Sequence, residues 1–178
     1  MPVSAAEVRA FEKRVRELQN QASAITNEAK VSTQEIVDLH RARIHDLISQ
    51  YDKAEAIPAR DAPRLSQQIT QEVNLMLDEA SSNLRIAQAD VWDKGIAAGQ
   101  SLSRTLGLEA AFFTPSTELL SIATSYTADL VRTISVDLMP QVNGLISRSV
   151  LGSLSPYEVM KEMDGLLGRN AAQGVSYQ

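Results

Sequence analysis

The sequence contains no cysteine, and only 4% of its residues are aromatic. The lack of cysteine excludes disulfides, thiolate catalysis and cysteine-liganded metals, and it fits a cytoplasmic protein. Ala, Leu, Ser and Gln are abundant instead, and several of these residue types favour helices. Val and Ile nowhere alternate with polar residues over a useful length, so no segment has the pattern of a strand. The composition therefore predicts an all-α protein.

Long hydrophobic runs and an excess of positive charge are also missing. The longest stretches without a charged residue span ten residues, for example 119–128, whereas a membrane-spanning helix needs roughly 18 apolar residues. The N-terminus lacks the basic and apolar regions of a signal peptide. The net charge of −5 argues against a dominant basic patch for duplex DNA. We therefore expect no membrane span and at most weak contact with DNA.

The first long segment, residues 4–56, contains neither glycine nor proline, and Ser4 with Glu7 forms a capping box at its start. Apolar residues then recur at alternating three- and four-residue intervals, and the register slips by one beyond Leu39. The predicted helix-seam interface comprises Val8, Phe11, Val15, Leu18, Ile25, Ile36 and Leu39. A helix of about 50 residues is about 75 Å long, and its narrow seam requires a second long helix, in this chain or in another.

Pro58 and Pro63 interrupt this pattern, because proline cannot occupy a helix interior without breaking a hydrogen bond. Residues 56–63 are therefore expected to form a short turn. The next segment, residues 63–103, again has apolar residues three or four apart. The simplest arrangement folds it back on the first segment, which makes residues 1–106 a long, antiparallel, coiled-coil-like helical hairpin.

Shorter helical signals follow, so residues 107–168 are predicted to form a small bundle of short helices, with a polar tail at 169–178. A loop with buried Phe112 and Phe113 leads to a helix that presents Leu119, Ala123, Tyr126 and Leu130 on one face. A second helix is expected to restart near Ser135 and to end at Gly152. The last helix has the clearest start: Ser155, Pro156 and Glu158 form a capping box, flanked by a staple of Leu154 and Val159. Gly165 and Gly168 are expected to end it.

Residues suited to catalysis or metal binding do not form a recognisable arrangement. The histidines, His40 and His45, are five apart and so point about 140° apart on a helix, which favours solvated side chains over a metal pair. Acidic pairs such as Asp78 and Glu79 have no histidine, lysine or glycine-rich turn nearby in the sequence. Nucleophile elbows and phosphate-binding loops are also missing from the sequence. We therefore predict no enzyme activity, no cofactor and no metal.

The densest basic cluster lies near the N-terminus and consists of Arg9, Lys13, Arg14 and Arg16. Glu12 and Glu17 are interleaved with it, which is typical of an exposed helix with salt bridges along its face. Weak phosphate contact is the alternative.

The C-terminal half resembles a known family. Residues 126–135, 142–152 and 153–159 follow the order of the phage head-morphogenesis domain, found in minor head proteins of the Mu F type. In that family a helix ends in glycine, and a Ser or Thr cap, an acidic residue and another helix follow. Gly152, Ser155 and Glu158 match these positions, and the resemblance extends over about residues 86–170. Family members continue with a further helix, so this chain is expected to be a short member, a processed product or part of a longer protein.

The resemblance implies a structural protein of the virion, made in the bacterial cytoplasm and located inside the capsid near the portal. Its role would be to support head assembly and genome packaging or delivery, in multiple copies or as a homo-oligomer, in contact with the portal or another capsid protein. It implies neither a cofactor nor catalysis. The alternative from the helical pattern alone is a cellular coiled-coil adaptor or the helical domain of a secreted effector.

Overall fold

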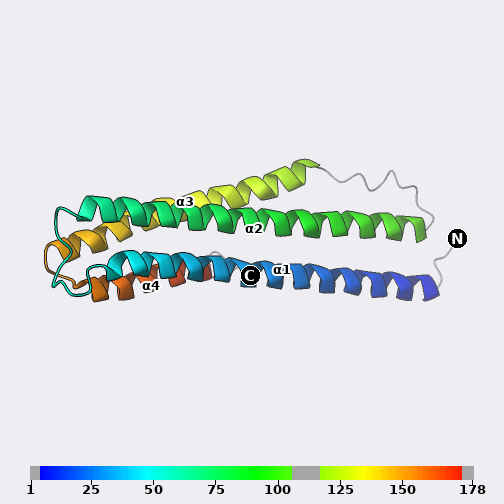
Figure 1. Ribbon diagram of the computed structural model, residues 1–178. Coiled ribbons are helices and arrows are strands. Elements are labelled where there is room, and N and C mark those ends of the chain that lie inside the picture. Colours follow the sequence, from blue (N-terminus) through cyan, green and yellow to red (C-terminus); the bar gives the residue numbers. More distant parts are fainter. Residues whose placement is uncertain (1–4, 106–116, 174–178) are drawn as a thin grey trace. The chain divides into compact units, whose positions relative to one another are not determined.

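A computed structural model describes residues 5–105 and 117–173 of the chain. Within them the chain is all-helical, as predicted, with α1 at Ala5–Ser49, α2 at Ala62–Thr105, α3 at Thr117–Val150 and α4 at Pro156–Gln173. The helices α1 and α2 form a long antiparallel pair, and the shorter helices lie against them (Figure 1). The predicted cap at Ser4 and the predicted loop with Phe112 and Phe113 lie outside the described residues.

The chain divides into two compact units, each assembled from separated segments. Unit 1 comprises residues 1–31 and 83–127, and unit 2 comprises residues 32–82 and 128–178. This grouping differs from the sequence-based division at residue 106. Each of the helices α1, α2 and α3 contributes one part to unit 1 and the other part to unit 2.

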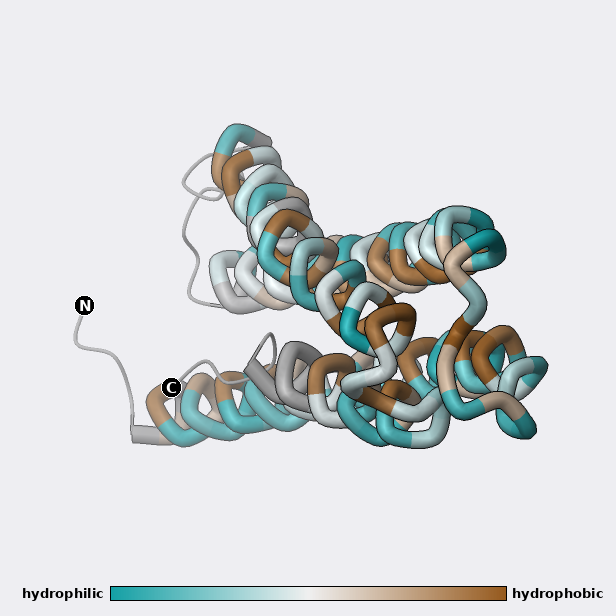
Figure 2. Tube along the Cα trace, turned by 90° about the vertical axis from the view of Figure 1, so that its left-hand side faces the viewer, coloured by the Kyte–Doolittle hydropathy of each residue, from teal (hydrophilic) through white to brown (hydrophobic). Residues whose placement is uncertain are grey.

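Unit 2 is a four-helix bundle with a continuous apolar core. All helices alternate hydrophobic and hydrophilic segments along their length (Figure 2), as expected for helices with one buried face. The largest fully buried apolar side chains come from every helix and from the α1–α2 connection: Ile44, Ile48, Ile57, Leu65, Ile69, Val73, Leu138, Val142, Val159, Met163 and Leu167. Because the chain crosses the bundle four times, each core side chain is covered by several others.

The connection between α1 and α2 contains the predicted proline turn. The carbonyl of Pro58 accepts hydrogen bonds from the backbone N–H groups of Asp61 and Ala62, at 2.9 and 3.2 Å. Ile57 is buried in the core, and its N–H donates to Ser149 Oγ at 3.3 Å. The helix α1 ends at Ser49, seven residues before the end expected from the sequence. Burial of Ile57 explains this early end, because the chain must turn inward before the prolines are reached.

Two expected helix boundaries in the C-terminal half are wrong. The helix α3 runs without interruption through Pro140, and α4 continues through Gly165 and Gly168 to Gln173. Pro140 lacks the N–H that would bond to the carbonyl of Val136, but both residues are exposed, so that carbonyl lies on the solvent side. One residue further along, Gln141 Nε2 donates to the carbonyl of Asp137 at 2.9 Å. Packing in the bundle therefore outweighs the local helix-breaking signals.

Candidate functional site

The seam of α1 in unit 1 is only partly covered. Val8 and Phe11 retain 45% and 41% of their accessible surface, whereas Val15, Leu18 and Ile25 are half-buried. Leu18 lines a shallow groove of about 210 Å³ with Ala97 and Ala98 of α2. Small alanine side chains cover less of a facing leucine than larger side chains would. The seam therefore exists as a helix contact, but α2 leaves much of it open.

The seam was predicted to continue along α1 to Leu39. Contacts within the chain do not bury Leu39, so this part of the prediction is wrong for the chain by itself. Ile36 is half-buried against the core of unit 2, but Leu39 is 50% exposed. The buried positions of α1 instead follow four-residue and three-residue steps through Ala29, Thr33, Val37, His40, Ile44 and Ile48. A straight helix drifts by about 20° per heptad relative to a seven-residue repeat. Over the three heptads from Val8 to Ala29 the drift is about 60°. Beyond Ala29, the residue that follows each seam position therefore lies on the buried face, such as His40 in place of Leu39.

Unit 1 has almost no buried apolar core. Among its described residues, the only buried hydrophobic side chain is that of Ala29. Polar contacts hold part of the unit together: Asn83 Nδ2 donates to the Ala29 carbonyl at 3.0 Å, and Gln88 Nε2 donates to Thr127 Oγ1 at 2.7 Å. Unit 1 is therefore a helix assembly that buries less apolar surface than unit 2 does.

The first part of α3 has an exposed row of apolar side chains, which includes Leu119 and Tyr126 of the face expected from the sequence. Leu119, Ile122 and Tyr126 are 57%, 58% and 56% exposed, and their spacing places them along one side of the helix. The inward side carries Thr127, which is buried and bonded to Gln88. The hydroxyl of Thr127 also donates to the Ala123 carbonyl at 3.2 Å, so its polar group is satisfied inside the helix. A row of apolar side chains along an accessible helix face is typical of a protein-binding surface.

The basic cluster lies on the exposed surface of α1. Arg9, Lys13, Arg14 and Arg16 are all exposed, and Arg14 Nη1 pairs with Glu17 Oε2 at 3.2 Å. Arg9, Lys13 and Arg16 lie at four- and three-residue steps on one side of the helix. This arrangement matches a salt-bridged helix face, and the predicted weak phosphate contact remains a prediction.

The junction of α3 and α4 has the local geometry expected from Gly152, Ser155 and Glu158. Gly152 has φ +71°, and its N–H donates to the carbonyl of Ser149 while the N–H of Ser153 donates to that of Arg148, both at 2.9 Å. This pattern is a Schellman motif, which favours glycine because a Cβ atom is strained at positive φ. The family-like junction is therefore a helix end followed directly by a helix start.

Ser155 and Glu158 cap the N-terminus of α4 reciprocally. The Ser155 N–H donates to Glu158 Oε2 at 2.8 Å, and the Glu158 N–H donates to Ser155 Oγ at 3.3 Å. Hydrogen bonds from the backbone N–H and the hydroxyl of Ser155 lower the pKa of Glu158 below 4.5. Leu154 and Val159 are both buried, which completes the predicted hydrophobic staple. The junction residues thus set the direction of the chain, and Glu158 also lines an open pocket of about 630 Å³ between α3 and α4.

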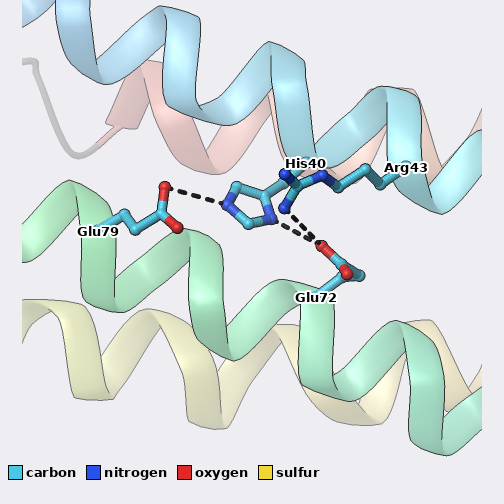
Figure 3. A network of polar contacts seen from close by, with 4 residues as sticks. All are labelled: His40, Arg43, Glu72 and Glu79. Atoms are coloured by element: carbon cyan, nitrogen blue, oxygen red, sulfur yellow. Dashed lines mark hydrogen bonds and ion pairs between the residues drawn. The ribbon is translucent and has the colours of Figure 1, made fainter.

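The prediction of solvated histidines is wrong for His40. Its ring is completely buried between α1 and α2, with Nδ1 2.8 Å from Glu72 Oε2 and Nε2 3.3 Å from Glu79 Oε2 (Figure 3). Glu79 belongs to the acidic pair that we expected to lack a histidine. His45 is 34% exposed, and its Nε2 lies 2.8 Å from Asp164 Oδ1 of α4. The sequence-based prediction missed the burial of His40 because it continued the seam through Leu39. The three- and four-residue spacing of Val37, His40 and Ile44 was a signal in the sequence that could have indicated this burial.

The described residues contain no group of three or more side chains suited to hold a metal ion. In the part of the chain that the structure covers, no helix is both long enough and apolar enough to cross a membrane. Comparisons of the chain with protein-family models, curated proteins and solved structures found no match.

Proposed function

We propose that this protein is a structural assembly component that acts by helix–helix association, and that unit 1 supplies the binding surface. One observation carries the proposal: unit 1 exposes large apolar side chains along its helices and buries only one small one among its described residues. Among its described residues, the large apolar side chains that unit 1 exposes are Val8, Phe11, Val31, Ile86, Leu119, Ile122 and Tyr126. Association with another helix would remove this apolar surface from water and so stabilise the unit.

We further propose the particular role of a minor head protein of a bacteriophage, inside the capsid near the portal. The resemblance of residues 86–170 to the phage head-morphogenesis domain supports this role, with Gly152, Ser155 and Glu158 at the matching junction. The partner would be the portal or another capsid protein, and the protein would be present in several copies. The mixed charges around Arg9, Lys13, Arg14 and Arg16 favour at most weak, salt-sensitive contact with DNA.

Mass spectrometry of purified virions tests the particular role. We expect the chain to be detected among the virion proteins, in smaller amounts than the major capsid protein. Absence of the chain from virions of the source phage, or a source genome without a portal gene, would contradict the viral role and favour a cellular adaptor.

Lysine cross-linking tests which unit binds the partner. The five lysines of the chain are all exposed: Lys13, Lys30 and Lys94 lie in unit 1, and Lys53 and Lys161 lie in unit 2. We expect cross-links between different proteins to involve the unit 1 lysines. Cross-links confined to Lys53 and Lys161 would assign the binding surface to unit 2.

A pair of variants of α3 tests the surface itself. Ile122→Ser changes an exposed side chain of unit 1, and Val136→Ser changes one of similar exposure in unit 2, at 58% and 65%. We expect Ile122→Ser to weaken partner binding at least tenfold with little loss of helical content, because the side chain contacts little within the chain. Equal binding by both variants and the unchanged protein would exclude this face of α3 from the interface.

A further inference from the structure

An open groove of about 630 Å³ lies between α3 and α4 in unit 2. Leu145 of α3 and Leu154 of the α3–α4 connection are buried and form its floor, and Leu166 of α4 lies half-buried beside them. Two glycines also line the groove, Gly144 on α3 and Gly165 on α4. A Cβ atom at Gly144 would meet nothing within 4 Å, so the space above this residue is open. The groove can therefore accept side chains that project from another helix.

Both helices line the groove with one side of their surface. The lining positions of α3 are 141, 144, 145 and 148, and those of α4 are 158, 161, 162, 165 and 166. Each set contains the pattern i, i+3, i+4, i+7, which follows one side of a helix for about two turns. An amphipathic helix binds in such a groove through apolar residues that are three or four positions apart. A helix with a short apolar row is therefore the occupant that fits.

The charged residues on the rim of the groove compensate one another. Arg148 Nη1 of α3 lies 3.5 Å from Glu162 Oε2 of α4, and Lys161 and Glu158 add one charge of each sign. The rim is thus formally neutral, although the whole chain has a net charge of −5. A charged occupant would lose contact with water here without gaining an unpaired charge of the opposite sign. The groove therefore favours an uncharged occupant.

The exposed row of Leu119, Ile122 and Tyr126 on the unit 1 part of α3 has the matching properties. Its members are three and four positions apart along one side of the helix. Residues 119–128 contain no charged side chain, so the row lies within one of the longest uncharged stretches of the chain. Binding of this row in the groove would remove apolar surface from water on both sides and would bury no charge of the row.

The row and the groove cannot meet within one chain. Both lie on α3, which is a single helix from Thr117 to Val150. The row ends at Tyr126, and the α3 side of the groove begins 15 residues further along the same helix, at Gln141. This separation corresponds to about 22 Å along the helix axis. A contact between the two surfaces therefore requires a second copy of the chain.

We propose that the apolar row of one copy binds in the α3–α4 groove of a second copy. This inference rests on the proposed binding role of unit 1, and it names a second copy of the chain as the partner of the α3 face. The two surfaces differ, so the contact is heterologous. Each pair of copies then still presents one row and one groove, and assembly continues into a closed ring or an open chain. Self-association through this contact is therefore not limited to dimers.

Sedimentation of the full chain and of two variants tests the contact. Ile122→Asp places a charge in the row, and Gly144→Gln puts a side chain into the groove, where its Cβ atom meets no other group. We expect the mean mass of the unchanged chain to rise with concentration beyond twice 19.4 kDa, and each variant alone to associate at least tenfold more weakly. The matched controls are Val136→Asp, on α3 outside both surfaces, and Gly95→Gln, at an exposed glycine of α2. Both controls should associate like the unchanged chain.

A mixture of the two variants identifies the kind of contact. Ile122→Asp retains an intact groove and Gly144→Gln retains an intact row, so one contact between them remains possible. We expect the mixture to form a dimer with one copy of each variant and no larger species. A mixture that stays monomeric, while the unchanged chain associates, would overturn the row-to-groove contact.

An unchanged chain that stays monomeric at about 1 mM, a concentration that reveals weak contacts, would also overturn the proposal. The groove would then be assigned to a helix of another protein. The proposed function would still stand if Ile122→Ser weakened binding of the partner protein, so the two failures are distinguishable.

Discussion

Unit 1 and unit 2 share three helices but bury very different side chains. In unit 2, four chain crossings enclose a core that includes Ile69 and Leu138, both completely buried. Unit 1 has the same long helices, yet its described residues bury alanine, glycine, serine and threonine and no large apolar side chain. Helix formation is therefore separate from core formation in this protein: an amphipathic stripe produces a helix in both units, but a closed core requires enough covering helices.

Truncation of one apolar side chain in each unit should reveal the largest difference in the free energy of unfolding between the units. We expect Ile69→Ala in unit 2 to lower the free energy of unfolding by about 2–5 kcal/mol, because a fully buried isoleucine leaves a cavity. We expect Leu18→Ala in unit 1 to cost less than about 2 kcal/mol, because that side chain is only half-buried. Urea unfolding followed by circular dichroism measures both. Similar losses would show that the seam is closed, and a Leu18→Ala loss that grows with protein concentration would show that another copy closes it.

The glycine at the end of α3 should be the next most sensitive position. Gly152 has φ +71°, so Gly152→Ala should lower the free energy of unfolding by about 1–2 kcal/mol through backbone strain. A Cβ atom at this position would meet nothing within 4 Å, so crowding does not contribute. Thermal unfolding of the variant measures the loss. An unchanged midpoint would mean that an alanine at this position is accommodated with no loss in the free energy of unfolding.

The cap of α4 should contribute about as much as an ordinary helix cap. Ser155→Ala removes the oxygen that accepts the Glu158 N–H, and we expect a loss of about 1 kcal/mol in the free energy of unfolding. Ser155→Asp should restore most of it, because aspartate caps helices as well as serine does. Chemical denaturation of both variants gives the comparison. If the two variants lose the same amount, the hydroxyl of Ser155 is not the stabilising group.

Two helical glycines allow the units to be compared without altering any contact. Gly95 in unit 1 and Gly144 in unit 2 are exposed, and a Cβ atom at either would meet nothing within 4 Å. We expect Gly95→Ala and Gly144→Ala each to raise the helix stability by about 0.5–1 kcal/mol. Hydrogen exchange of the surrounding amides localises the gain to one unit. A gain at both sites in either variant would show that the two units unfold together.

Acid should act selectively on the junction through Glu158, with the smallest of these effects because that side chain is exposed. Its pKa is lowered in the folded protein by the N–H and hydroxyl of Ser155, so the ionised form is the stabilising one. This stabilisation is present above about pH 4.5 and is lost as the pH falls through the folded pKa. We expect Glu158→Gln to lose less stability than the unchanged protein between pH 6 and pH 3. Glu118→Gln, which alters an exposed first-turn glutamate of α3, should behave like the unchanged protein.

The local signals in the sequence were sufficient for the two long helices and for the α3–α4 junction, but not for the unbroken course of α3 or the end of α4. Three-four spacing predicted long helices on either side of the proline turn, and Gly152, Ser155 and Glu158 adopt the predicted cap geometry. These features depend on residues within a few positions of one another, so their energetics are contained in short segments. The junction residues of the candidate site were predictable for the same reason.

Only the tertiary structure decided which residues each helix buries. A drift of less than one residue along α1 brought Val37 and His40 inward and left Leu39 exposed, and the sequence pattern alone cannot choose between two neighbouring three-four stripes. Packing in the bundle also carried α3 through Pro140, whereas Leu119, Ile122 and Tyr126 in unit 1 are exposed. The amino-acid sequence by itself determined that this protein is helical and that the chain turns at the prolines after α1 and at the α3–α4 junction. The pairing of α1 with Glu72, Glu79 and Asp164 joins residues far apart in the chain, so it depends on how the helices come together.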